Sequence, residues 1–213
     1  MPDFADRRVT MVDTQVRPSD VTKFPVIAAM LAVPRERHVP PALREAAYVG
    51  ENLPLSPGRV VLEPRSLGKM LDALDIAPDD RVLDLGTGLG YSAAVIAEMA
   101  GSVVAVEAGL AEQARAALAD VRNVTVIEAP LTEGAPAEGP YDVIAVQGGV
   151  EQVPQALLDQ LAEGGRIACL FMEGALGTCR IGTRVAGTVS WRDAFNAAAP
   201  VLPGFERARE FAL

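Results

Sequence analysis

The sequence predicts an α/β fold in which a mostly parallel, twisted sheet carries helices on both faces. After residue 79, short apolar segments of strand length alternate with segments of helical periodicity, the pattern of parallel βαβ units. A glycine-rich turn, residues 84–90, follows the first of these strands. Half of the 213 residues are hydrophobic and 22% are charged, a composition that can fill a sizeable core.

The chain is expected to form one domain, 1–213, made of an N-terminal helical and irregular extension and a core. The extension, 1–78, is expected to cover the site, and the core occupies 79–213. Residues 1–20 are polar, so we expect them to be partly ordered at best.

Periodicity and turn residues predict the individual elements. In the extension, a helix is expected over 21–33 with Asp20 as its N-cap, and another begins at Pro64. Between them lies an irregular, proline-rich connection, 34–59, with a short helix near 42–47. In the core, strands are expected at 81–86, 102–108, 124–129, 141–149 and 166–171, helices at 91–100, 109–121 and 154–165, and antiparallel strands within 175–196.

Composition argues against several partners and sites. The net charge of −9 disfavours nucleic acid, whose binding needs Lys and Arg against phosphates. The N-terminus lacks an apolar signal segment and no run of about 18 apolar residues exists, so we expect a cytoplasmic protein without a membrane partner. Cys169 and Cys179 lack metal-ligand spacing and are expected to be buried, reduced thiols. With one histidine, no metal site is expected.

The glycine-rich turn reads DLGTGLG, with glycines at 86, 88 and 90. A strand, a glycine loop and a helix place backbone N–H groups at the carboxyl edge of a parallel sheet. Dinucleotide sites favour GxGxxG, and Tyr91 stands where its third glycine would be. The carboxylate of Asp84 suits a cationic ligand, so we expect S-adenosylmethionine, which carries an ammonium and a sulfonium.

A second acidic residue, Glu107, ends the next strand about 20 residues after the loop. A carboxylate at this point can accept both hydroxyls of a ribose. NAD and S-adenosylmethionine share that contact, so Glu107 does not by itself distinguish the two cofactors.

Together these residues resemble the protein-L-isoaspartate O-methyltransferase family, from about Val16 to about Phe171. The resemblance rests on MLAVPRERHVPPALREAAYVGENLPLSPGR, on DLGTGLGYSAAVIAEMAG, on NVTVIEAPLTEG and on PYDVIAVQGGVEQVPQALLDQLAEGGRI. It implies a Rossmann-like methyltransferase fold, S-adenosyl-L-methionine as cofactor and a protein or peptide substrate. The family methylates the α- or β-carboxylate of damaged aspartyl residues, which initiates their repair.

The resemblance implies roles for individual residues. Gly86, Thr87, Gly88 and Gly90 would cradle the methionine part of the cofactor, and Glu107 would hold its ribose. The family's acidic residue near the adenine is missing, because Ala129 and Pro130 stand in that segment.

The predicted catalytic segment also departs from the family pattern. Leu62 stands where the family has a Ser or Thr hydroxyl, and Glu63 follows it. A charge at Glu63 would repel a carboxylate substrate, whereas Arg65 can pair with the substrate or with Glu63. Alternatively, Glu63 and Arg65 form a solvated pair at a helix start.

Three functions therefore stay open. The first is an isoaspartyl methyltransferase, the second a divergent methyltransferase with another substrate, and the third a non-catalytic module that binds S-adenosylmethionine or no cofactor. An NAD-dependent dehydrogenase is a more distant fourth. The sequence gives no oligomeric state.

Overall fold

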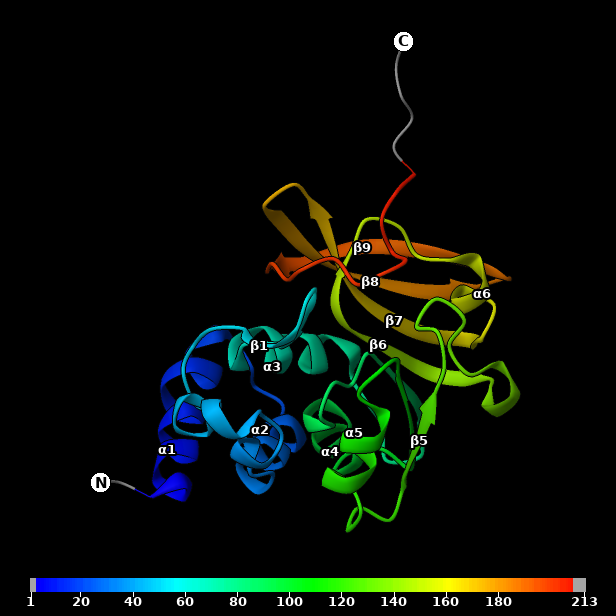
Figure 1. Cartoon of the computed structure of the whole chain (residues 1–213). Coiled ribbons are helices and arrows are strands. Elements are labelled where there is room, and N and C mark those ends of the chain that lie inside the picture. The colour runs from blue at the N-terminus through cyan, green and yellow to red at the C-terminus, as the bar shows by residue number, and fades with distance from the viewer. Residues whose placement is uncertain (1–2, 209–213) are drawn as a thin grey trace.

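The structure, a computed structural model, describes residues 3–208 and is built around one seven-stranded sheet (Figure 1). The strand order is β5-β4-β3-β6-β7-β8-β9. Neighbours from β5 to β7 pair in parallel, and β8 and β9 extend the sheet antiparallel. The α/β fold with a mostly parallel sheet and an antiparallel tail is thus confirmed.

The strands lie close to the predicted positions. The sheet contains β3 (Arg81–Leu85), β4 (Ser102–Glu107), β5 (Val124–Glu128), β6 (Tyr141–Val150), β7 (Leu161–Glu173), β8 (Leu176–Val185) and β9 (Thr188–Asn196). A separate antiparallel hairpin, β1 (Leu53–Ser56) and β2 (Arg59–Val61), lies within the segment predicted to be irregular.

The helices are short, and three of the six in residues 3–208 precede the first strand of the seven-stranded sheet while the other three lie between its strands. They are α1 (Phe4–Met11), α2 (Phe24–Ala32), α3 (Pro64–Leu74), α4 (Tyr91–Ala97), α5 (Ala111–Ala117) and α6 (Gln155–Leu158). One π-helical turn (Val12–Val16) follows α1, and 3₁₀ turns occur at Arg17–Ser19, Arg35–Arg37, Pro41–Ala46 and Pro136–Glu138.

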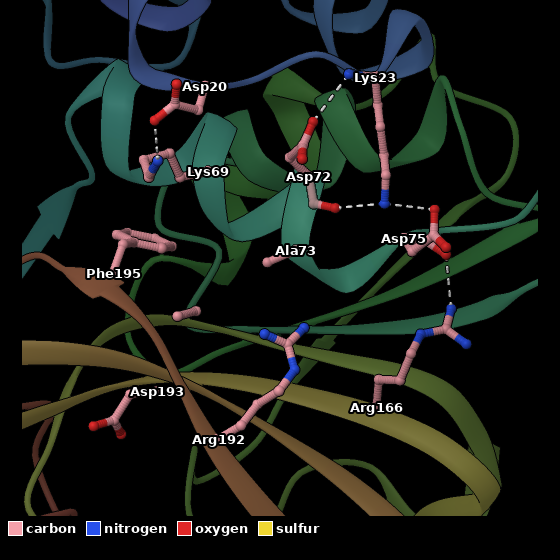
Figure 2. A pocket seen from close by; sticks show the side chains of 11 residues that line it. Asp20, Lys23, Lys69, Asp72, Ala73, Asp75, Arg166, Arg192, Asp193 and Phe195 are labelled. Carbon is pink, nitrogen blue, oxygen red and sulfur yellow. Dashed lines mark hydrogen bonds and ion pairs between the residues drawn. The ribbon is translucent and has the colours of Figure 1, made fainter.

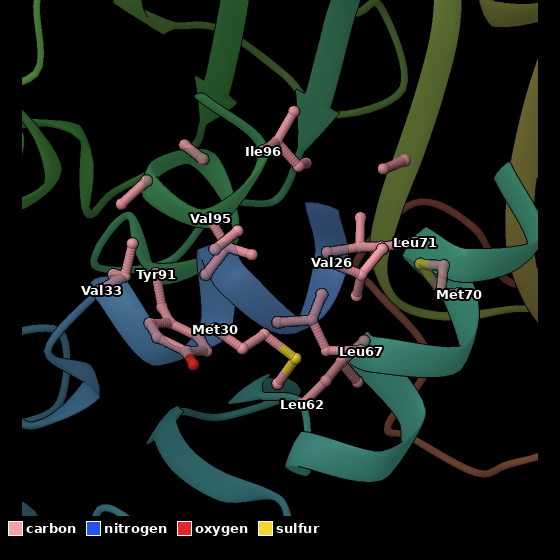
Figure 3. Close-up of a cluster of buried hydrophobic side chains, with 14 of the residues drawn as sticks. Val26, Met30, Val33, Leu62, Leu67, Met70, Leu71, Tyr91, Val95 and Ile96 are labelled. Carbon is pink, nitrogen blue, oxygen red and sulfur yellow. The ribbon is translucent and has the colours of Figure 1, made fainter. Parts of the chain in front are cut away.

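The two faces of the sheet are covered differently. On one face, side chains of α2, α3 and α4 such as Met30, Leu67 and Val95 form a single buried cluster (Figure 3). On the other face, the sheet packs against Leu157 of α6 and against Leu202 and Phe205 of the C-terminal segment 197–205. This segment therefore supplies much of the cover that helices give to the first face.

The prediction that residues 1–20 are partly ordered at best is wrong for 3–20, and residues 1–2 lie outside the described part of the chain. Asp3 caps α1 by accepting a hydrogen bond from the Asp6 N–H at 2.8 Å. Met11, Val12 and Val16 are buried in the cluster under α2 and α3. Asp20 is also not the cap of α2, because it adopts a left-handed backbone with φ of 62° and the helix begins only at Phe24.

The predicted helix over 154–165 is much shorter in the structure. It ends at Leu158, and β7 begins at Leu161. Arg184 Nη1 donates to the carbonyls of Leu158, Asp159 and Leu161, so the carbonyl groups at the end of the helix are satisfied without a further turn.

The C-terminal segment 197–205 crosses the carboxyl end of β6. The Gly149 N–H donates to Pro200 O at 2.8 Å, and the Leu202 N–H donates to Gly149 O at 2.9 Å. A Cβ atom at Gly148 would lie 2.5 Å from Leu202 Cδ2. Glycine at this position therefore lets the segment lie directly on the strand.

Both cysteines are buried in the sheet, as predicted. Cys169 lies on β7 and Cys179 on β8, where Cys179 pairs with Leu170, and both are free thiols. Burial raises the pKa of Cys179 to about 12 and that of Cys169 well above its usual range. Within residues 3–208, no helix has both the length and the apolar character needed to cross a membrane.

Phe205 is expected to anchor the C-terminal segment. Its side chain is fully buried, so Phe205→Ala should lower the free energy of unfolding by about 3–5 kcal/mol through lost contacts and a cavity. Phe24→Ala is the matched control, because that ring is 77% exposed and its loss should change stability little. Equal urea midpoints for the two variants would contradict this role.

Candidate functional site

The glycine loop connects β3 to α4 at the carboxyl edge of the sheet. Gly86, Gly88 and Gly90 have φ of 80°, 61° and 86°, values that favour glycine over residues with a Cβ. Their N–H groups donate to Val106 O, to a carboxylate oxygen of Glu107 and to Thr87 O. The loop is thus rigidly held, and two of its bonds run to the end of β4.

Asp84 lies under the loop and is fully buried. One carboxylate oxygen accepts from Ser92 Oγ at 2.6 Å and the other from Gln147 Nε2 at 2.8 Å. Burial raises its pKa to about 6, opposed by these hydrogen bonds and by Thr87. The structure does not support Asp84 as a direct contact for a cationic ligand, because the carboxylate is enclosed and joins β3, α4 and β6.

Glu107, the predicted ribose carboxylate, is also fully buried and accepts four hydrogen bonds. The Gly88 N–H reaches Oε2 at 2.6 Å and the Ala108 N–H reaches Oε1 at 2.9 Å. The other two bonds come from Arg59, whose Nη1 and Nη2 lie 2.5 and 2.6 Å from Oε1 and Oε2. An ionised carboxylate offers about four lone-pair sites, so its capacity is used.

Arg59 is absent from the predicted site. It begins β2 of the hairpin and reaches the end of β4, 48 residues further along the chain, with only 5% of the residue exposed. The sequence around Arg59 gives little indication of a role in the site, because it shows only one basic residue between Gly58 and two valines in an apolar stretch. Only the tertiary fold reveals that its partner is Glu107.

Side chains of the chain itself fill the crevice in front of the glycine loop. A Cβ atom at Gly88 would overlap Leu55 of β1. A Cβ atom at Gly86 would lie 3.4 Å from Arg59 Nη2 and 3.7 Å from Leu202 Cδ1. The cavity that remains beside the loop measures about 10 Å³, whereas pockets for small molecules usually measure about 300–1,000 Å³.

The polar groups of the site and the volume of the crevice therefore differ in how well they suit S-adenosylmethionine. The glycine loop and Glu107 lie at one sheet edge, as the resemblance requires, and Thr87 lines the small cavity with Gly86. The carboxylate of Glu107 is the kind of acceptor that a ribose needs, but Arg59 binds it in this conformation. The filled crevice does not leave room for the cofactor in this conformation.

Leu62 belongs to the buried cluster below the hairpin. It is 2% exposed and lies near Met30 and Leu67 (Figure 3). Its carbonyl accepts from Arg35 Nη2 at 2.8 Å, which fixes the backbone at this point. Leu62 also lines the 10 Å³ cavity beside Gly86, so it borders the site with an apolar surface.

Glu63 and Arg65 lie at the start of α3. Glu63 Oε1 accepts from Ser66 Oγ at 2.6 Å and lies 3.8 Å from Arg65 Nη1. Arg65 also donates to Asn196 O at 3.2 Å, and 42% of its side chain is exposed. This geometry matches the alternative of a partly solvated pair at a helix start, and Glu63 does not join the Arg59–Glu107 pair.

Ala129 and Pro130 follow β5, next to the end of β4. The Ala129 N–H donates to Glu107 O at 3.2 Å, and Pro130 is exposed. Proline has no N–H and no side-chain polar atom, so Pro130 offers no side-chain hydrogen bond toward the crevice. Ala129 and Pro130 thus lie close to the predicted site but offer no polar side-chain group to a ligand.

A cavity of about 510 Å³ lies elsewhere, between α3 and β9 (Figure 2). Its lining is charged, with Lys23 bound to Asp75 at 2.6 Å and Lys69 lying 3.8 Å from Asp20. None of the residues that line it belongs to the glycine loop. The cavity is therefore separate from the predicted cofactor site.

The enclosed Asp84 is expected to make stability depend on pH. Its folded-state pKa of about 6 lies above the value of about 3.9 for an unfolded aspartate, so the folded chain binds more protons between these values. Stability should fall as pH rises from about 4 to about 6. Over this range the free energy of unfolding of the wild type should fall by about 3 kcal/mol relative to that of Asp84→Asn, because each unit of pKa shift corresponds to about 1.4 kcal/mol.

Urea unfolding of both proteins across this pH range measures the difference. Asp79→Asn, an exposed aspartate on the turn before β3, is the control and should follow the wild-type curve. If the wild type instead gains stability relative to Asp84→Asn between pH 4 and 6, the pKa of Asp84 is not raised in the folded protein.

Known proteins are similar to this chain in sequence. The protein-L-isoaspartate O-methyltransferase of Methanoculleus marisnigri is 40% identical over 164 residues, which cover 75% of this chain and 74% of the relative. The protein of the same name from Gloeobacter violaceus is 41% identical over 161 residues, covering 74% and 78%.

A solved structure shares the fold. The Plasmodium falciparum PCMT in complex with S-adenosyl-L-homocysteine has a TM-score of 0.78 and 19% identity, covering 95% of this chain and 99% of that one. The family model for protein-L-isoaspartate(D-aspartate) O-methyltransferase matches residues 8–173, which include the hairpin, the glycine loop and Glu107. The chain therefore belongs to the protein-L-isoaspartate(D-aspartate) O-methyltransferase family.

Proposed function

We propose that this protein is an S-adenosylmethionine-dependent O-methyltransferase that methylates the carboxylate of isoaspartyl residues in damaged proteins. The observation that carries the proposal is the glycine loop joined to Glu107 within the matched family segment. Named relatives at about 40% identity over three quarters of the chain support the same activity. The proposed setting is the cytoplasm, with protein or peptide substrates.

The proposed methyl transfer does not require an acid or base from the protein. When bound, S-adenosylmethionine supplies an electrophilic methyl group. A substrate carboxylate is already ionised at pH 7, because an aspartate titrates near pH 4, so no general base is needed. The proposed roles are binding and alignment: Gly86, Thr87, Gly88 and Gly90 beside the cofactor, and Glu107 at its ribose.

The extension 1–78 has a proposed role in covering the site. Its hairpin places Leu55 against Gly88 and Arg59 against Glu107. Leu62, Glu63 and Arg65 follow the hairpin directly and remain the proposed border of the substrate path. Ala129 and Pro130 form the opposite border in this proposal.

The test is methyl-ester formation on a synthetic isoaspartyl peptide. Purified protein with radiolabelled S-adenosylmethionine at millimolar concentration should label this peptide and leave the matched aspartyl peptide unlabelled. Hydrolysis of the product at alkaline pH should release the label as methanol. A labelled isoaspartyl peptide supports the proposal, and labelling of neither peptide contradicts it.

A second candidate is a divergent methyltransferase that acts on another substrate. The buried, apolar Leu62 favours it, because the family's hydroxyl is missing where substrate orientation would use it. One such hydrogen bond contributes about 0.5–1.5 kcal/mol, or up to about 3 kcal/mol with a charged acceptor, which corresponds to roughly up to a hundredfold in rate. Labelling of a cellular protein extract, but of neither synthetic peptide, would favour this candidate.

Restoring a hydroxyl at Leu62 is expected to weaken the fold. Leu62→Ser removes buried methyl groups and encloses a hydroxyl, so the free energy of unfolding should fall by about 3 kcal/mol. Leu176→Ser is the control, because that leucine is 78% exposed. Thermal melts of the two variants measure the loss of stability. A Leu62→Ser variant as stable as the wild type would mean that the Leu62 side chain lies outside the buried cluster.

A further inference from the structure

The buried pair between Arg59 and Glu107 occupies the place that the cofactor needs. Glu107 is the proposed ribose ligand, yet each of its carboxylate oxygens already accepts one bond from Arg59 and one from a backbone N–H. The two backbone donors belong to the loop and to the strand end, so they stay in place when a ligand binds. Ribose hydroxyls can reach Glu107 only where Arg59 now binds.

Arg59 suits this position better than a neutral side chain would. A guanidinium presents two parallel N–H groups that match both oxygens of a carboxylate, and burial strengthens the pair. Two vicinal hydroxyls of a ribose would present the same pair of donors to the same two oxygens. The arginine fork therefore imitates the ribose in geometry and adds a charge that the ribose lacks.

Two features of the closed arrangement favour its opening. Arg59 Nε is buried and, within residues 3–208, has no hydrogen-bond acceptor, which makes the closed state less favourable. The hairpin that carries Arg59 has strands of four and three residues, and hairpins this short are marginally stable alone. The hairpin is held down by Arg59, by Leu55 over Gly88 and by Asn52 Nδ2, which donates to Ala198 O at 2.9 Å.

We infer that Arg59 is an internal competitor for the cofactor's ribose on Glu107, so that Arg59 sets the cofactor affinity of this chain and leaves Glu107 when the cofactor binds. The inference rests on the proposed function for the identity of the ligand. Its consequence is that apparent affinity equals the intrinsic affinity multiplied by the fraction of molecules in which Arg59 is displaced. Weakening the pair therefore tightens cofactor binding.

The test is calorimetric titration of S-adenosylhomocysteine into four proteins. Arg59→Gln removes the charge and one prong of the fork, and its Kd should be at least about tenfold lower than that of wild type. Arg59→Lys keeps the positive charge beside Glu107 but loses the fork, so its Kd should lie between those two values. Arg44→Gln makes the same charge change at an exposed arginine, and its Kd should equal that of wild type.

Arg59→Lys also protects the test against misfolding. Arg59→Gln leaves Glu107 buried without its countercharge, which can unfold a protein, whereas the lysine variant retains a countercharge. Circular dichroism establishes that each variant is folded before titration. If only Arg59→Lys folds, a lower Kd for it than for wild type supports the inference.

The outcomes separate this inference from the proposed function. Equal Kd values for wild type and the folded Arg59 variants overturn the competitor role and leave the methyltransferase proposal standing. Tighter binding by the variants without methyl ester on any isoaspartyl peptide supports the competitor role and overturns the proposed reaction. Absence of binding to every folded variant at millimolar ligand overturns both.

Discussion

The carboxylate of Glu107 joins three segments that are far apart in the sequence. Through its four hydrogen bonds it connects the end of β4 to the glycine loop after β3 and to the hairpin of the N-terminal extension. A buried charge without partners would be costly, so each of these segments is held where its donor reaches the carboxylate. Glu107 thereby holds Arg59 and the hairpin over the glycine loop, where Leu55 and Leu202 complete the filling of the crevice.

Much of the core could be predicted from local patterns. Strands β3, β4 and β6 read as short apolar runs because parallel strands with both faces covered are buried almost throughout, whereas β5 at the sheet edge is only half-buried. The glycine loop and Glu107 were predictable because the connection between parallel strands fixes where strand ends lie. The antiparallel tail was also predictable, since alternation of polar and apolar residues marks β8 and β9.

Three failures of prediction involve partners distant in sequence. Residues 4–16 look polar, yet Met11, Val12 and Val16 find apolar neighbours on α2 and α3. The helix after Pro154 ends early because Arg184, in another strand, satisfies its carbonyls. Arg59 could not be recognised as part of the site, because its role depends on a carboxylate 48 residues away. Local periodicity carries no information on such contacts.

The position of the two cysteines has a consequence for oxidative chemistry. Cys169 on β7 and Cys179 on β8 are buried in the hydrophobic clusters on opposite faces of the sheet, and their raised pKa values keep them protonated. A thiol reacts with peroxides or electrophiles as the exposed thiolate. Oxidation of this protein therefore requires opening of the clusters that bury the two thiols, which couples its sensitivity to oxidants directly to its folding equilibrium.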